Sequence, residues 1–176
     1  LRLAAVVWKD KKERYAGLLK VVGQMYNQAG FYKKAEEMLE KARQWMEESN
    51  STDYNDWASV YYQLADIKST LEKKSEAETA YRNAVVYAQK DTSLFYTFIQ
   101  NATLFANFCT TNKLFAKADS LHNVIAAVTN NPGNQSYNVF LSNLLVWGLN
   151  KIKSGDSAAS VRLIDSAIQL AQHYYI

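Results

Sequence analysis

The sequence predicts an all-α fold of about four helical hairpins stacked as a solenoid, and three observations support this. The 176 residues include one proline and six glycines, with 48% apolar and 13% aromatic residues, which favours long helices over strands broken by turns. Apolar residues recur three and four positions apart, as they do on one face of a helix. Small residues also recur at a nearly constant interval along the chain.

The stretch from Tyr15 to Trp45 is the repeating unit, and its pattern predicts two helices joined by a tight turn. We call the position of a residue within the unit its phase, and we number the phases from Ala16, which is phase 1. The later segments are aligned on the small residue at phase 20. This residue recurs at steps of 42, 41 and 42 residues: Ala35, Ala77, Ala118 and Ser160. Small residues also occupy phase 8: Gly23, Ala65, Ala106 and Gly148. Phase 27 is small except in the third repeat: Ala42, Ala84, Ile125 and Ala167. Small side chains let helices approach closely, so these phases mark where helices should pack.

This register divides the chain into four repeats, approximately residues 13–53, 54–91, 92–134 and 135–176. The expected helix pairs are Glu13–Gln28 with Tyr32–Glu48, Tyr54–Leu71 with Lys74–Lys90, Thr92–Thr111 with Leu114–Thr129, and Ser136–Lys153 with Ser157–Tyr174. The segment NNPGN, from Asn130 to Asn134, holds the only proline and predicts a loop between the third and fourth repeats.

Four of the glycines fall at only two phases of the repeat. Gly30 and Gly155 lie where the turn between two helices favours a left-handed backbone, although Glu72 takes this place in the second repeat. Gly23 and Gly148 lie within helices, where glycine costs about 1 kcal/mol relative to alanine. We therefore expect close helix packing at these two glycines.

Aromatic residues recur at phase 0, just before each unit: Tyr15, Trp57, Phe98 and Phe140. Together with the residues three positions earlier, at phase −3, they extend the apolar face of each first helix, which should then be about 18 residues or about 27 Å long. A ladder of this kind could stack on bases or form a ligand box. At helical spacing and equal phase, we expect core between repeats instead.

The two ends of the chain differ from a capped solenoid. Residues 1–12, ending in the charged run KDKK, predict either a frayed terminus or the last turns of a preceding repeat, so we expect a fragment of a longer protein. The last helix stays apolar on more than one side, where solenoids normally carry a polar cap: Val161, Leu163, Ile164, Ile168, Leu170, Tyr174, Tyr175 and Ile176. This helix is expected to pair with a second copy, as a homodimer, or with a missing neighbour.

The motif Leu19, Val22, Gly23, Tyr26, followed by Ala35, Leu39 and Ala42, resembles that of the tetratricopeptide repeat. The resemblance covers nearly the whole chain, in the long-helix variety with repeats of about 42 residues found in bacterial signalling regulators and scaffolds. It implies a right-handed superhelix that forms a single domain over residues 1–176. It also implies that the first helices line a concave groove for peptides.

The groove positions implied by this resemblance carry mostly amide and hydroxyl side chains: Lys20, Gln24, Asn27, Gln28, Tyr62, Gln63, Asp66, Gln100, Thr103 and Asn107. Such side chains suit hydrogen bonding to the backbone of an extended peptide, although an ordinary wetted surface would look the same. Only Lys20 matches the family's carboxylate clamp, so an adaptor for chaperone tails is disfavoured. In the fourth repeat, the corresponding face is apolar, which suits another helix better than a peptide: Leu145, Leu149 and Ile152.

Charge and hydropathy exclude other partners for this segment. The net charge is +3, and lysines alternate with glutamates, as in KKAEEMLEKAR, without forming the basic stripe that nucleic-acid binding needs. No apolar run is long enough to enter a membrane as a helix. Cys109 is the only cysteine, so no intrachain disulfide forms and the compartment stays open. Cytoplasm and periplasm both fit, including the extracytoplasmic part of a membrane-anchored regulator.

The sequence predicts no enzyme, metal site or cofactor, because it lacks the corresponding motifs. The one constellation to weigh is Cys109 at phase 11 with His122 at phase 24, since these phases face each other within a hairpin and could pair a thiol with an imidazole. We favour a core contact. A metal site formed by His122 and His173 is also disfavoured, because they lie 51 residues apart in different repeats and the sequence shows no set of carboxylates or thiols to complete it. The leading interpretation is a non-catalytic scaffold for protein or peptide partners, and the alternative is the peptide- or ligand-sensing part of a transcriptional regulator or sensor kinase.

Overall fold

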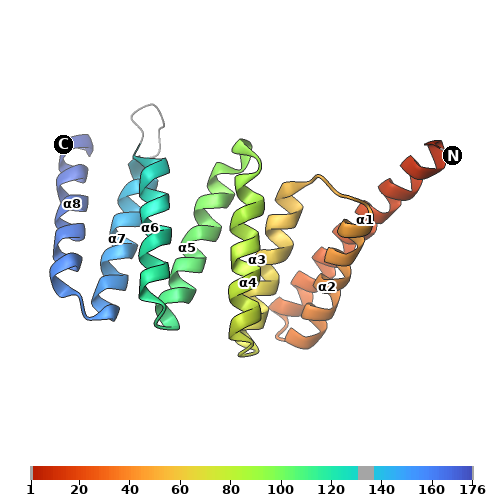
Figure 1. The fold of residues 1–176 in the computed structure, drawn as a ribbon, viewed down its shortest axis with the longest axis horizontal. Coiled ribbons are helices and arrows are strands. Elements are labelled where there is room, and N and C mark those ends of the chain that lie inside the picture. Colours follow the sequence, from red (N-terminus) through yellow and green to blue (C-terminus); the bar gives the residue numbers. More distant parts are fainter. Residues whose placement is uncertain (1, 131–136, 176) are drawn as a thin grey trace. The chain divides into compact units, whose positions relative to one another are not determined.

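The computed structural model describes residues 2–130 and 137–175, which form eight α-helices, one short 3-10 helix and no strand (Figure 1). The elements in order are α1 (Arg2–Gln28), α2 (Tyr32–Glu48), α3 (Tyr54–Thr70), α4 (Lys74–Gln89), η1 (Thr92–Leu94), α5 (Phe95–Thr111), α6 (Phe115–Thr129), α7 (Tyr137–Ser154) and α8 (Ser157–Tyr175). The predicted all-α hairpin repeat is therefore confirmed. Residues 131–134 of the predicted NNPGN loop, and Ile176 of the apolar C-terminus, lie outside the described residues.

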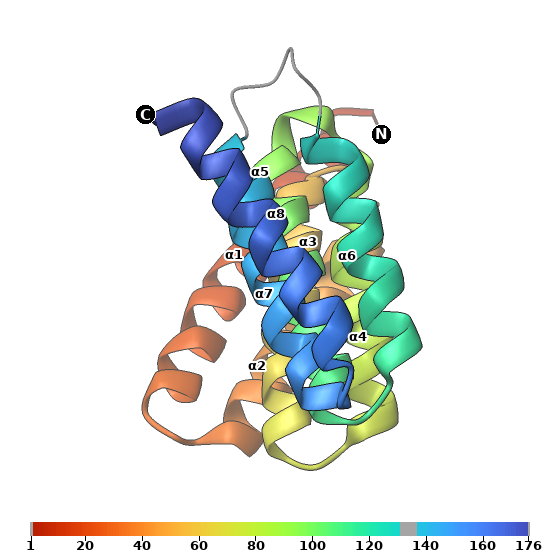
Figure 2. The ribbon, with the colours of Figure 1, turned by 90° about the vertical axis from the view of Figure 1, so that its left-hand side faces the viewer.

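The chain divides into two compact units, residues 1–101 and residues 102–176, with the boundary inside α5. In unit 1, α1 pairs with α2 and α3 pairs with α4, and α3 also packs on α2 and touches α1. In unit 2, α7 and α8 form an antiparallel hairpin, and α6 packs against α7 (Figure 2). The expectation of a single domain over residues 1–176 stays a prediction.

The first helix is longer than the sequence predicted. The sequence predicts a frayed terminus or the last turns of a preceding repeat over residues 1–12, but α1 continues without a break from Arg2 to Gln28. This stretch contains no proline, and its first glycine is Gly17, so the charged run interrupts no backbone hydrogen bond. Lys12 also ties α1 to α2, because its ammonium lies 2.9 Å from a Glu48 carboxylate oxygen and 5.5 Å from the ring centre of Trp45.

All four hairpin turns close in the same way. The residue at phase 15 has a positive φ in each repeat: Gly30 at 78°, Glu72 at 61°, Lys113 at 61° and Gly155 at 83°. The next residue donates its backbone N–H to the carbonyl oxygen at phase 11: Tyr26, Lys68, Cys109 and Lys151, at 2.8–2.9 Å. This is the bond that caps a helix C-terminus. Because it satisfies a helix-end carbonyl, glutamate and lysine tolerate a left-handed backbone costing about 1–2 kcal/mol.

The small residues at phase 20 occupy equivalent surroundings, as the repeat predicts. All four are buried, with exposed fractions of 0–2%. Each also donates its backbone N–H to the carbonyl oxygen four positions earlier, at the start of its helix: Ala35 to Phe31, Ala77 to Lys73, Ala118 to Leu114 and Ser160 to Asp156. The hairpins are therefore built in one register.

The glycines at phase 8 confirm the predicted close packing. A Cβ at Gly23 would lie 2.8 Å from Leu39 Cγ and 3.4 Å from the Ala35 carbonyl oxygen. At Gly148, it would lie 3.1 Å from Ile164 Cγ1 and 3.5 Å from the Ser160 carbonyl oxygen. In both hairpins, the glycine thus faces phases 24 and 20 of the second helix.

The aromatic ladder at phase 0 is core in only part of the chain. Trp57 and Phe98 are buried, as predicted. Trp57 stacks on Tyr87 of its own hairpin at 5.0 Å, so this contact lies within a repeat. Tyr15 departs from the prediction, since its side chain is 55% exposed although its ring lies 5.8 Å from that of Trp45.

Candidate functional site

The predicted groove residues lie on the first helices of the hairpins, and none of them is fully buried. Eight belong to unit 1: Lys20, Gln24, Asn27 and Gln28 on α1, Tyr62, Gln63 and Asp66 on α3, and Gln100 on α5. Thr103 and Asn107, also on α5, belong to unit 2. Because α1 touches α3, the structure brings the members on these two helices onto neighbouring elements.

Lys20 marks the place where α1 meets α3. Its ammonium forms an ion pair with Asp56 in the first turn of α3, and both side chains are partly buried. Asp56 accepts this pair close to the N-terminus of α3, where a carboxylate is stabilised by the helix dipole. The charge of Lys20 is therefore already matched, which argues further against a carboxylate clamp at this position.

Tyr62 and Asp66 form a polar pair one turn apart on α3. Burial raises the pKa of Tyr62, and the nearby Asp66 carboxylate raises it further. The same two causes, burial first, raise the pKa of Tyr81 on α4. Both phenols therefore stay protonated at neutral pH and keep an O–H donor. The half-buried Tyr62 can offer this donor to a carbonyl oxygen at the surface of α3.

Gln63, between these two groups, has an unmet hydrogen-bonding requirement. Its Nε2 donates to Ser59 Oγ at 3.2 Å, while its Oε1 is buried and has no hydrogen-bond partner. If the amide were turned over, Oε1 would accept from the Ser59 hydroxyl and Nε2 would be left unpaired. An unpaired buried amide group costs about 1–3 kcal/mol. A small rotation that exposed this amide would give it a partner from a bound molecule.

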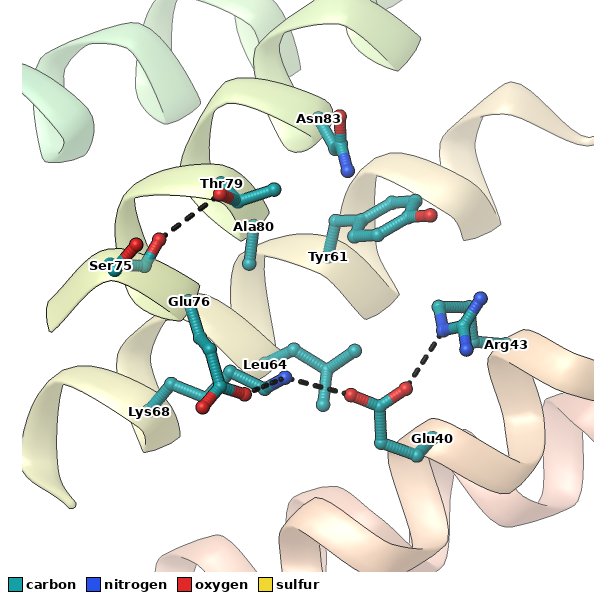
Figure 3. A pocket seen from close by; sticks show the side chains of 10 residues that line it. All are labelled: Glu40, Arg43, Tyr61, Leu64, Lys68, Ser75, Glu76, Thr79, Ala80 and Asn83. Atoms are coloured by element: carbon teal, nitrogen blue, oxygen red, sulfur yellow. Dashed lines mark hydrogen bonds and ion pairs between the residues drawn. The ribbon is translucent and has the colours of Figure 1, made fainter. Parts of the chain in front are cut away.

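A separate hollow of about 320 Å³ lies between α2, α3 and α4 (Figure 3). The residues that line it are Glu40, Arg43, Tyr61, Leu64, Lys68, Ser75, Glu76, Thr79, Ala80 and Asn83. Lys68 Nζ lies between two carboxylates, 2.8 Å from Glu40 and 3.0 Å from Glu76, and Arg43 Nε donates to Glu40 at 2.8 Å (Figure 3). The charged groups are thus paired with one another across three helices.

Protonation in this hollow favours the paired state. Burial opposes the charge on Glu40, but the hydrogen bonds from Lys68 and Arg43 outweigh it and lower the pKa of this carboxyl. Burial likewise opposes the charge on Lys68, whose pKa is nevertheless raised by Glu40 and Glu76. Because each charge has its partner within the protein, we interpret this hollow as an ion-paired helix junction. Sequence reasoning missed it, although Glu40 and Lys68 lie at phases 25 and 11, which meet across repeats.

The Cys109–His122 constellation is not assembled as a catalytic pair. Both residues are fully buried. The two ring nitrogens of His122 bond to asparagine side chains of α7, since Nδ1 lies 2.8 Å from Asn143 Oδ1 and Nε2 lies 2.9 Å from Asn150 Nδ2. The expected core location holds, but the environment is a polar network at the α6–α7 junction. Burial lowers the pKa of His122, and the bond to Asn143 opposes this only in part.

Residues 2–130 and 137–175 contain no group of three or more histidine, cysteine, aspartate or glutamate side chains placed to hold a metal ion. Over the same residues, every helix is too short or too polar to cross a membrane.

Comparison with known proteins supports the tetratricopeptide resemblance over part of the chain. The tetratricopeptide repeat family matches residues 15–87, from α1 into α4. A search of curated proteins found no match.

Two solved structures have a similar fold. The crystal structure of BtubC (BKLC) from P. vanneervenii is 18% identical, with a TM-score of 0.75, and the alignment covers 99% of this chain and 75% of that one. The crystal structure of MamA is also 18% identical, with a TM-score of 0.63, and the alignment covers 97% of this chain and 88% of that one. At this identity, the likeness establishes the helical-hairpin repeat fold and nothing about partners.

Proposed function

We propose that this chain is a non-catalytic interaction module that binds an extended peptide segment of a partner protein along its first helices. Within unit 1, the eight candidate side chains of α1, α3 and α5 would contact this segment. They are mostly uncharged, and such a lining suits the backbone of a peptide better than a specific charged tail. A repeat scaffold of this kind offers a long surface of similar positions on successive hairpins.

The observation that carries this proposal is the unpaired amide group of Gln63. Among the described residues, it is the buried side-chain polar atom that lacks a hydrogen-bond partner. Tyr62 offers an O–H donor and Asp66 an acceptor on the same helix. A peptide strand alternates N–H and C=O groups along its length, so a glutamine that both donates and accepts is suited to it. Binding would replace an unsatisfied atom with a satisfied one.

An array of short peptides of unbiased sequence, probed with the labelled chain, tests this proposal. We expect a set of bound peptides whose affinity survives side-chain alanine scanning but falls when single backbone nitrogens are methylated, because N-methylation removes the donor that Gln63 would accept from. The variant Gln63→Ala should weaken binding by roughly tenfold, about the value of one or two hydrogen bonds.

The matched control is Gln89→Ala, an exposed glutamine on the second helix α4, and this variant should bind peptides as the unchanged chain does. Equal weakening by both substitutions would place the peptide elsewhere on the molecule. An array without bound peptides would contradict the proposal.

The setting of this module is a further part of the proposal. We place it in a bacterial regulatory protein, as a scaffold or as the peptide-sensing part of a transcriptional regulator or sensor kinase. This rests on the resemblance of the amide-rich lining to the grooves of such regulators. None of the ten candidate peptide-binding residues lies on the C-terminal helix α8.

A further inference from the structure

An apolar stripe on α1 lies open to solvent in unit 1. Its most exposed members are Tyr15, Leu18 and Met25, with exposed fractions of 55%, 56% and 64%. Val22, between Leu18 and Met25 in the sequence, and Tyr26, after Met25, complete what we call the α1 stripe. Two hollows open along it, one of about 270 Å³ beside Tyr15 and one of about 430 Å³ beside Met25. An apolar surface of this kind is typical of an interface.

The repeat register identifies what kind of element covers this stripe. Leu18 and Met25 occupy phases 3 and 10, and the residues at these phases in the other three repeats are buried, with exposed fractions of 0–7%: Val60, Asn101 and Asn143 at phase 3, and Ile67, Phe108 and Asn150 at phase 10. The first repeat is therefore the one in which these two positions are uncovered.

Direct contacts show which helix covers the equivalent positions elsewhere. In unit 2, Asn143 and Asn150 of α7 bond to His122 of α6, the second helix of the preceding hairpin. In unit 1, Asn101 lies 3.4 Å from the Ala84 carbonyl oxygen of α4, again the preceding second helix. By equivalence, the α1 stripe fits the second helix of another hairpin.

The chain carries a second helix with an uncovered outer face, α8. The α8 stripe consists of Val161, Asp165 and Ile168, at phases 21, 25 and 28, and the two apolar members are 58% and 49% exposed. The same phases of α2 hold Glu36, Glu40 and Arg43, which face α3. In α8, these positions meet no following hairpin among the described residues.

The two stripes also match each other in chemistry. At both hairpin junctions where the pair is seen, an acid at phase 21 lies beside a lysine at phase 11: Glu36 with Lys68 at 3.9 Å, and Asp119 with Lys151 at 2.6 Å. On α8, phase 21 is Val161, and on α1, phase 11 is Tyr26. Both members of this ion pair are thus replaced by apolar residues, and Asp165 remains the one charged member of the α8 stripe.

We propose that α8 of one molecule packs on the α1 stripe of a second copy, in the way that α2 packs on α3 and α6 packs on α7 within the chain. The contact is heterologous, since each molecule contributes two different surfaces. It goes beyond the proposed peptide binding and does not depend on it. The predicted pairing of the C-terminal helix with a second copy thereby receives a specific partner surface, α1 rather than another α8.

Sedimentation of the chain over a range of concentrations tests this proposal with two double variants. Leu18→Glu with Met25→Glu blocks the α1 stripe, and Val161→Glu with Ile168→Glu blocks the α8 stripe. We expect the unchanged chain to associate as its concentration rises and each double variant to remain monomeric. An equimolar mixture of the two should form a one-to-one dimer, because each retains the surface that the other lacks.

Val86→Glu is the matched control, an exposed apolar residue on α4 that belongs to neither stripe, and it should associate as the unchanged chain does. Circular dichroism shows whether each variant stays helical, and Met25→Gln and Ile168→Gln replace any variant that does not. A chain that stays monomeric, or a mixture that does not associate, would overturn the proposal. So would a dimer abolished by blocking α8 alone and unaffected by blocking α1, since α8 would then pair with itself.

Discussion

At the scale of single residues, the fold depends on side chains that are absent or minimal. Gly23 faces Leu39, which is fully buried and therefore cannot move away from an added methyl group. Gly17, six residues earlier in the same helix, has no neighbouring atom within 4 Å of where a Cβ would lie. Both glycines carry the conformational cost of glycine in a helix, but only Gly23 is required by packing.

The variants Gly17→Ala and Gly23→Ala should therefore change stability in opposite directions. Gly17→Ala should raise the free energy of unfolding by about 0.5–1 kcal/mol, the helix-propensity gain. Gly23→Ala should lower it by about 1–2 kcal/mol, because overpacking outweighs that gain. Urea denaturation of both variants measures the difference, and a stability gain in both would show that α1 and α2 have room between them.

Some residue-scale features could be predicted from the sequence and others could not. The left-handed turns at Gly30 and Gly155 follow from the glycines themselves. Glu72 and Lys113 take the same conformation for a reason outside their own chemistry, since the capping hydrogen bond to the preceding helix imposes it. The exposure of Tyr15 escaped prediction because phase alone does not tell whether a neighbouring hairpin covers it.

At the scale of helices, the α6–α7 junction is joined by polar side chains, and two of them, His122 and Asn150, stand at phases that hold apolar or aromatic residues in the other repeats. His122 bonds through both ring nitrogens to Asn143 and Asn150 and stacks on Trp147 with ring centres 5.6 Å apart. With this assignment of the amides, Nδ1 carries the proton and Nε2 accepts a hydrogen bond from Asn150. A second proton on Nε2 would face the Asn150 amide donor, so the junction requires the neutral imidazole.

The stability of unit 2 should therefore fall in mild acid. The pKa of His122 lies below the ordinary value of 6.5 in the folded protein, so below about pH 6.5 the unfolded chain binds more protons than the folded one. This contribution to stability is present above that value and is lost as the pH falls toward the folded pKa. Urea unfolding at about pH 7.5 and about pH 5.5 should show the loss in the unchanged chain.

The variant His122→Gln supplies the comparison for this pH effect. It should be less stable at neutral pH, since it disturbs the bonds to both asparagines, and the drop in stability between the two pH values should be smaller. A drop of the same size in His122→Gln would assign the pH dependence to other groups.

Helix bounds could be predicted closely, whereas contacts between hairpins could not. The ends of α2 agree with the prediction, whereas the predicted first helix begins only at Glu13, after the charged run, and α1 begins at Arg2. The polar network of His122 and the ion pairs of Lys68 depend on which residues meet across neighbouring hairpins. The periodicity of one helix carries no information on such pairs. Comparing the phases that meet across neighbouring hairpins could have revealed them.

At the scale of the whole molecule, the chain is a series of similar hairpins, and its two open stripes follow from that. A repeat buries its first helix under the preceding hairpin and its second helix under the following one. The candidate groove residues could be assigned to the first helices from the sequence, because their helix depends on phase alone. The α1 stripe could not be recognised, since its exposure appears only when buried and exposed residues of equal phase are compared.

The central claim is that small residues at phase 20 nest the two helices of all four hairpins in the same way. The most direct measurement is urea denaturation of four variants, Ala35→Leu, Ala77→Leu, Ala118→Leu and Ser160→Leu, against leucine two residues later at exposed positions: Glu37, Thr79, Ser120 and Arg162. Each phase-20 variant should lose roughly 1–3 kcal/mol of stability, while each control should change little. Phase-20 variants that unfold at the same urea concentration as their controls would contradict the account.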